Sequence, residues 1–116
     1  MLFRSWGDGT QLRSYCHVTD AIEGMIRTMQ TNHHTAINIG TDRSISIKDF
    51  TQLIIDISGK DLSIKYVDGV IGVKSRNSDN TLSKKLLNWK PVIELEEGMT
   101  ILYKWILEQV KNKQND

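Results

Sequence analysis

The chain has 116 residues, of which 39% are apolar and 25% are charged, so its length and composition are those of one globular domain. Its formal net charge of +1, with basic residues scattered along the chain, excludes a nucleic-acid surface built on bulk positive charge. No apolar run approaches the roughly 20 residues of a membrane span, and the start lacks the apolar core of a signal peptide, so we expect a cytoplasmic protein that binds no membrane.

The N-terminal residues predict two short strands and a helix. Asp8-Gly9 lies between short apolar runs and is typical of a hairpin turn, because glycine tolerates a positive φ. We expect one strand before this turn and another over Leu12–Val18 after it. Thr19 suits a helix N-cap, and Gly24 indicates a close packing contact within the helix. That helix, over residues 20–30, is predicted from apolar residues at helical spacing: Ala21, Ile22, Met25, Ile26 and Met29.

The middle of the chain predicts a strand, a capped helix and a second strand. Residues 35–40, Thr-Ala-Ile-Asn-Ile-Gly, are short and mostly β-forming, which indicates a buried strand. Ser46 followed by Asp49 is a capping-box pattern, and Gly59 suits the left-handed residue at a helix end. The alternation over Leu62–Val67 predicts a strand.

The last third predicts a polar loop and two helices. The loop over Gly72–Leu82 leads into a short helix from about Thr81 to Asn88. Acidic residues then open a long amphipathic helix at Leu95, whose apolar rhythm continues for three turns. The predicted fold class is therefore α/β, with short strands and about four helices.

The polar loop has the chemistry of an anion site. Arg76 can present a guanidinium fork, and the loop adds side-chain amides and the free N–H groups of a helix start, which suits a phosphate or diphosphate. Composition alone leaves another reading open, a solvated turn in which Asp79 or Asn80 caps the following helix. Arg13 is likewise compatible with an ordinary exposed strand position.

Six short motifs occur in an order and at spacings that resemble a known family. Together they are similar to the C-terminal third of the extended short-chain dehydrogenases/reductases, over roughly residues 3 to 110. Two of them, Trp-Gly-Asp-Gly-x-Gln-x-Arg and Arg-Asn-Ser-Asp-Asn, resemble the GDP-mannose 3,5-epimerases within that family. The motifs are Trp6–Ser14, Val18-x-Asp20, Asn38–Gly40, Gly72–Asn80, Leu87-x-Trp89-x-Pro91 and Leu95-x-x-Gly98.

The resemblance implies a substrate, a nucleoside diphosphate sugar, and two residues that hold its diphosphate. Arg13 would contact the diphosphate from one side and Arg76 from the other. Two guanidinium forks suit a diphosphate, which carries about two negative charges, through paired charge-assisted hydrogen bonds. The same resemblance places further residues at the substrate site: Gln11, Leu12, Asn77 and, as a wall of the nucleotide pocket, Trp6.

The chain also departs from the family. The parent enzymes use NAD, but the Gly-rich turn that holds this cofactor and the Tyr-x-x-x-Lys pair do not occur in this sequence. We therefore expect one fragment-like domain over residues 1–116 that lacks the N-terminal Rossmann core, binds no NAD alone and is not active alone. Cys16 does not match the family's catalytic cysteine, and Cys16-His17 and His33-His34 lack the spacing of a metal site.

Two classes of function remain open at this point. The first is the substrate-binding segment of an NAD-dependent nucleotide-sugar epimerase. The second is a non-catalytic binding or interaction protein, or a gene remnant, derived from such an enzyme. In either case the apolar helix faces lack partners, so we expect self-association, with a dimer as its simplest form.

Overall fold

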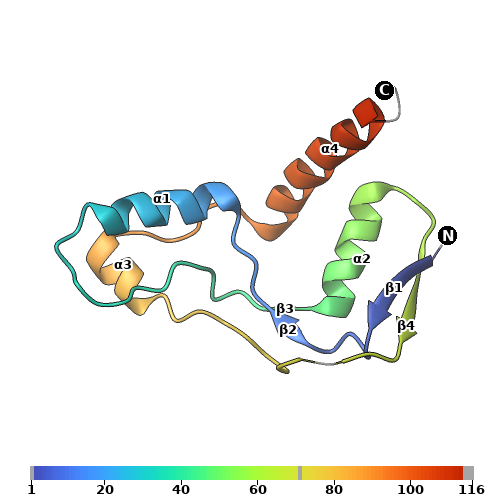
Figure 1. The fold of residues 1–116 in the computed structure, drawn as a ribbon, viewed down its shortest axis with the longest axis horizontal. Helices are drawn as coiled ribbons and strands as arrows, with labels where there is room; N and C mark the ends of the chain where they lie inside the picture. The colour runs from blue at the N-terminus through green and yellow to red at the C-terminus, as the bar shows by residue number, and fades with distance from the viewer. Residues whose placement is uncertain (1, 71, 114–116) are drawn as a thin grey trace.

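The computed structural model describes residues 2–70 and 72–113, and it confirms an α/β fold with four helices and short strands (Figure 1). The elements, in chain order, are β1 (Leu2–Trp6), β2 (Leu12–Arg13), α1 (Val18–Met29), β3 (Ile45–Ser46), α2 (Ile47–Ser58), β4 (Ser63–Val67), α3 (Thr81–Leu87) and α4 (Leu95–Lys113).

The strands form two separate pairs. β1 pairs in parallel with β4, so that Leu2 lies opposite Ser63, and β2 pairs antiparallel with β3. The predicted hairpin at Asp8-Gly9 is therefore wrong, because β1 and β2 do not pair with each other. The Asp8 carboxylate closes the turn locally instead, by accepting hydrogen bonds from the Thr10 N–H (3.0 Å) and hydroxyl (2.7 Å).

Two predicted strands are shorter than expected or not formed. The strand predicted over Leu12–Val18 is limited to Leu12–Arg13, and α1 begins at Val18 with His17, not Thr19, as its N-cap. The predicted strand over residues 35–40 is wrong, since these residues pair with no strand in the part of the chain that the structure describes. A strand needs a neighbouring strand for its backbone hydrogen bonds. Here side-chain amides bond to the backbone instead, as when Asn80 Nδ2 donates to the Gly40 carbonyl at 3.0 Å.

The predicted limits of α2 are confirmed by its caps. The Ser46 hydroxyl accepts a hydrogen bond from the Asp49 N–H at 3.0 Å and donates one to the Asp49 carboxylate at 2.6 Å. At the other end Gly59 adopts the left-handed conformation, with φ of 63°. Both signals are local in sequence, which is why the pattern alone was sufficient to find them.

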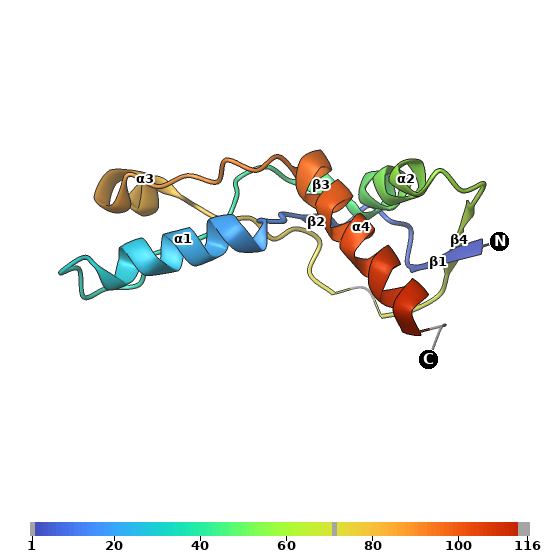
Figure 2. The same ribbon diagram turned by 90° about the horizontal axis from the view of Figure 1, so that it is seen from above.

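The molecule is extended and has a small core. α1 and α3 lie at one end, whereas β1, β4 and α2 lie at the other (Figures 1 and 2). The radius of gyration is 17.2 Å, against about 13 Å for a compact domain of this length. The buried apolar side chains among the described residues are Ile55, Leu87 and Trp89.

Several apolar positions that the sequence assigns to buried faces are instead exposed. Met29 on α1 is 84% exposed, and Ile106 on α4 is 45% exposed. In Figure 1, α4 projects from the rest of the molecule. None of the helices in the described ranges has the length and apolarity needed to span a membrane.

A buried carboxylate joins α1 to the segment between α3 and α4. Asp20 is 5% exposed, and its Oδ2 accepts hydrogen bonds from the N–H groups of Val92 (3.1 Å) and Ile93 (2.9 Å). The indole Nε1 of Trp89 donates to the Asp20 carbonyl at 3.1 Å. Gly24 lies one turn further along α1, where a Cβ would come within 2.6 Å of Ile39 Cγ2 and 3.0 Å of Trp89 Cε2. The predicted close packing at Gly24 is thus confirmed.

We expect Asp20→Ala to destabilise the fold, because it leaves two part-buried backbone N–H groups without their carboxylate acceptor. The expected loss is about 2–3 kcal/mol of unfolding free energy, measured by urea denaturation. Glu23→Ala, one turn away on α1 and exposed in an ion pair with Arg27, is the control and should cost about 0.5 kcal/mol or less. Equal losses for the two variants would contradict this role for Asp20.

Candidate functional site

The residues predicted to bind a diphosphate meet at the backbone of Leu12. Leu12 forms a parallel bridge with Ser75, and its N–H donates to the Lys74 carbonyl at 2.8 Å. Its carbonyl oxygen accepts two hydrogen bonds, one from the Arg76 N–H at 3.2 Å and one from Arg13 Nη1 at 2.7 Å. One carbonyl therefore contacts both of the arginines that the sequence singled out.

The register of this bridge places the two arginines as neighbours. Arg13 and Arg76 each follow a member of the Leu12–Ser75 pair, so the backbones of the two arginines lie next to each other. The ion pairs found among the described residues involve Arg27, Arg43 and Lys84, and neither Arg13 nor Arg76 takes part in them. Two arginines on adjacent backbone segments, neither in an ion pair among these residues, favour the binding of an anion.

A surface cleft of about 400 Å³ lies beside Arg13. It brings together three of the predicted residues, Trp6, Gln11 and Arg13, with Gly72 of the polar loop. Trp6 is 67% exposed, and one side of its ring packs against Gly69. Arg76 and Asn77 do not line this cleft. Arg76 is connected to it through the hydrogen bond from its backbone N–H to the Leu12 carbonyl.

Gln11 has an unusual environment in the cleft wall. Its backbone carbonyl accepts the Ile47 N–H at 3.0 Å, which joins β2 to the start of α2. The side chain is buried, at 8% exposed, and its Oε1 has no hydrogen-bond partner among the described residues. A buried carbonyl oxygen without a donor costs about 1–3 kcal/mol, so Gln11 is the least satisfied polar group at this site.

At the start of α3, one of the N–H groups that the sequence offers to an anion is already bonded to Asp79. Asp79 Oδ1 accepts hydrogen bonds from the Thr81 N–H (2.9 Å) and hydroxyl (2.7 Å), and these bonds lower the pKa of the Asp79 carboxyl. Of the two predicted caps, Asp79 therefore performs the role, whereas the Asn80 side chain makes no cap bond. A carboxylate at this position repels an anionic ligand.

Asn77, also predicted to contact substrate, is held by hydrogen bonds within the protein. Its Oδ1 accepts from the Ser14 hydroxyl at 2.9 Å and from the Ser78 N–H at 2.7 Å, and its Nδ2 donates to the Asp42 carbonyl at 3.0 Å. One amide thus connects three segments that are distant in the sequence. Ser14 and Asp42 could not be found as hydrogen-bond partners of Asn77 from the sequence, since no local pattern reveals pairing over such separations.

Cys16 and the histidines show no sign of a reactive or metal site. Burial is the main cause of a raised pKa of the Cys16 thiol, and the nearby Asp20 carboxylate raises this pKa further. The raised pKa keeps the thiol protonated. Within residues 2–70 and 72–113, no cluster of three or more histidine, cysteine or acidic residues could hold a metal ion.

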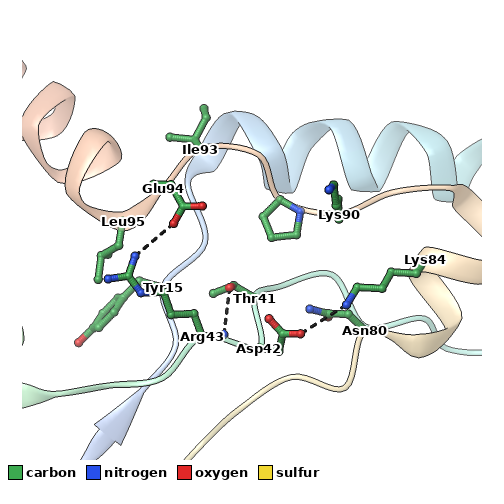
Figure 3. Close-up of a pocket in the computed structure, with 11 residues that line it drawn as sticks. Tyr15, Thr41, Asp42, Arg43, Asn80, Lys84, Lys90, Ile93, Glu94 and Leu95 are labelled. Carbon is green, nitrogen blue, oxygen red and sulfur yellow. Dashed lines mark hydrogen bonds and ion pairs between the residues drawn. The ribbon is translucent and has the colours of Figure 1, made fainter.

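A second, smaller cavity of about 210 Å³ lies between the α1–α3 end and the start of α4 (Figure 3). Most of its charged groups are paired. Arg43 binds Glu94 at 3.2 Å and also binds Glu96, and Lys84 lies 3.4 Å from Asp42. Arg43 lowers the pKa of Glu96 to about 2, chiefly through its hydrogen bonds to the carboxylate. None of the predicted substrate residues lines this cavity.

Comparison with known proteins identifies the family. A family model described as the NAD dependent epimerase/dehydratase family matches residues 3–40. GDP-mannose 3,5-epimerase 1 from Oryza sativa subsp. indica is 36% identical over 111 residues, and GDP-mannose 3,5-epimerase from Arabidopsis thaliana is 37% identical over the same length. This chain is homologous to part of the NAD-dependent epimerase/dehydratase family. Each alignment covers 96% of the chain but only 29% of the relative's length.

Solved structures of epimerases share the fold. The UDP-glucuronic acid 4-epimerase from Bacillus cereus, in complex with UDP-glucuronic acid and NAD, is 29% identical, with a TM-score of 0.82 over 91% of this chain and 35% of its own. The UDP-glucose 4-epimerase from Thermotoga maritima, with UDP-glucose, is 28% identical, with a TM-score of 0.88 over 92% of this chain and 35% of its own. The family resemblance predicted from the six motifs is thus confirmed.

We expect stability to depend on pH through Glu96. Its pKa in the folded protein, about 2, is below its ordinary value of 4.5, so its stabilising effect is present above pH 4.5 and is lost as the pH falls towards 2. Glu96→Gln should lower Tm slightly at pH 7, and the difference from wild type should disappear between pH 4.5 and 2. Glu97→Gln, the adjacent acid in the first turn of α4, is the control. A Tm difference that persists unchanged at pH 2 would contradict the ion pair.

Proposed function

We propose that this chain is the part of an NAD-dependent nucleotide-sugar epimerase, similar to GDP-mannose 3,5-epimerase, that binds the diphosphate of the substrate. The convergence of Arg13 and Arg76 on the Leu12 carbonyl supports this proposal most directly. The relatives named above act on GDP-mannose, and the similar solved structures hold UDP-glucuronic acid or UDP-glucose. All of these ligands are nucleoside diphosphate sugars.

In this proposal the two arginines bind the diphosphate by different approaches. Arg13 lines the cleft beside β1. Only one of the five N–H groups of its guanidinium is bonded to the Leu12 carbonyl, so the guanidinium has donors for a phosphate. Arg76 is exposed and approaches from the polar loop. Gln11 and Trp6 would form the wall of the cleft near the nucleotide or sugar. Leu12 would contribute its position alone, because its backbone N–H and carbonyl are already bonded.

The chain's own residues do not fit the NAD cofactor of the family. A dinucleotide pyrophosphate needs a glycine-rich turn that leads from a strand into an uncapped helix start. β3 leads directly into α2, but there Ser46 and Asp49 occupy the helix start. α1 has Asp20 in its first turn, α3 is capped by Asp79, and α4 begins with two glutamates. We therefore assign binding and orientation of the diphosphate to this chain, and no proton or hydride transfer.

The diphosphate assignment predicts a loss of GDP binding in two variants. We expect Arg13→Ala and Arg76→Ala each to weaken GDP binding by about 10- to 100-fold, because each removes charge-assisted hydrogen bonds worth about 1.5–3 kcal/mol. Nuclear magnetic resonance titration into the millimolar range measures this effect. Arg43→Ala removes the same charge away from the cleft and is the control. The assignment is wrong if wild-type protein binds GDP and neither variant weakens that binding.

The exposed apolar faces lead to a separate proposal, that isolated chains self-associate. α1 exposes a stripe of apolar side chains, and α4 exposes another on its projecting surface. Burial of such surface contributes about 25 cal/mol of favourable free energy per square ångström. This favours association with a second copy of the chain that covers these faces. The residues are Val18, Ile22, Met25, Ile26 and Met29 on α1, with Ile101, Leu102, Trp105, Ile106 and Val110 on α4.

Light scattering tests this proposal. We expect the average mass to rise above 13.3 kDa at high micromolar concentration, and the double variant Trp105→Glu/Ile106→Glu to shift association to higher concentration. Glu108→Gln on the same helix, which adds no charge to the stripe, should leave association unchanged. A stable wild-type monomer at high micromolar concentration would refute the proposal.

A further inference from the structure

We propose that Asn77 is a positioning residue that holds Arg76 beside Arg13 and does not itself bind the diphosphate. The inference deepens the proposed function and depends on it for the role of Arg76. It begins from an observation in the polar loop: the residue directly after Arg76 makes side-chain hydrogen bonds to two other segments of the chain.

The hydrogen bonds of Asn77 fix the loop on both sides. Its Oδ1 accepts from the Ser14 hydroxyl, which belongs to the segment that follows Arg13 directly. Its Nδ2 donates to the carbonyl of Asp42, in the segment that leads to β3. β3 in turn pairs with β2, so that Arg13 lies opposite Ile45. Asn77 therefore connects the Arg76 loop to both strands of the pair that contains Arg13.

The amide has little capacity left for a ligand. Its oxygen accepts two hydrogen bonds, from Ser14 and from the Ser78 N–H, which uses both lone pairs. One of the two N–H groups of Nδ2 is directed to the Asp42 carbonyl. The second N–H is the one group left over, so the amide can offer a phosphate at most one hydrogen bond.

The backbone of the arginine loop needs this support because it forms only a single bridge with β2. The Lys74–Arg76 segment pairs with Leu12 alone, through two backbone hydrogen bonds. One bridge fixes a register but resists displacement poorly, since neighbouring ladder bonds are missing. Asn77 adds side-chain bonds directly beyond the end of this bridge. The function of Arg76 then depends on the amide of its neighbour.

Amide hydrogen exchange tests the positioning role without any ligand. We expect Asn77→Ala to raise the exchange rate of the Arg76 N–H about tenfold and to leave the β1–β4 amides unchanged. Ser14→Ala removes one donor to Oδ1 and a longer contact of the same hydroxyl with the Arg76 carbonyl (3.5 Å), and it should act in the same direction. Asn38→Ala is the matched control, because it removes an amide hydrogen bond to the same loop at Asp79, further from Arg76. Unchanged Arg76 exchange in both Asn77→Ala and Ser14→Ala would overturn the inference.

GDP titration of a double-variant cycle separates positioning from direct contact. We expect Asn77→Ala to weaken GDP binding about tenfold in the wild-type background and by less than twofold in Arg76→Ala. Equal weakening in both backgrounds would show direct contact and overturn the inference. If wild type binds GDP and neither Arg13→Ala nor Arg76→Ala weakens that binding, the proposed function fails, while the exchange rates still decide whether Asn77 holds the loop.

Discussion

The peptide group of Leu12 is the constraint on which the candidate site depends. It lies in a strand of only two residues, with β3 on one side and the arginine loop on the other. Its carbonyl receives a backbone N–H from Arg76 and a guanidinium N–H from Arg13. Because both donors reach one oxygen, the Arg76 backbone and the Arg13 guanidinium lie side by side at this point. Leu12 makes these contacts with main-chain atoms, so none of them depends on its side chain.

The Arg-Asn-Ser-Asp-Asn run divides into one exposed cation and four residues that build its support. Asn77 joins three segments, Ser78 donates to the Asn80 side chain, Asp79 caps α3, and Asn80 donates to the Gly40 carbonyl. Polar residues at a ligand site are often interpreted as ligand contacts. Here most of them replace backbone pairing that the irregular segments 38–42 and 77–80 do not make.

The parts of the fold that could be predicted are those with local causes. Ser46 with Asp49 and Gly59 fixed both ends of α2, and apolar spacing identified α4. Predictions that needed knowledge of a distant partner were less successful. The hairpin at Asp8-Gly9 and the strand over residues 35–40 were wrong because a turn signal or β-forming residues do not specify which segment lies alongside. The association of Arg13 with Arg76 came from the family resemblance, since no periodicity connects residues so far apart.

The parallel pairing of β1 with β4 determines when the N-terminal strand can become ordered. Leu2 pairs with Ser63, so β1 has no partner until more than half of the chain is available. Helices α1 and α2 can form earlier because their hydrogen bonds are local, whereas closing the long loop between the two strands carries an entropy cost that only tertiary contacts offset. During synthesis, β1 would therefore remain unpaired while α1 and α2 already form, because β4 leaves the ribosome after both helices.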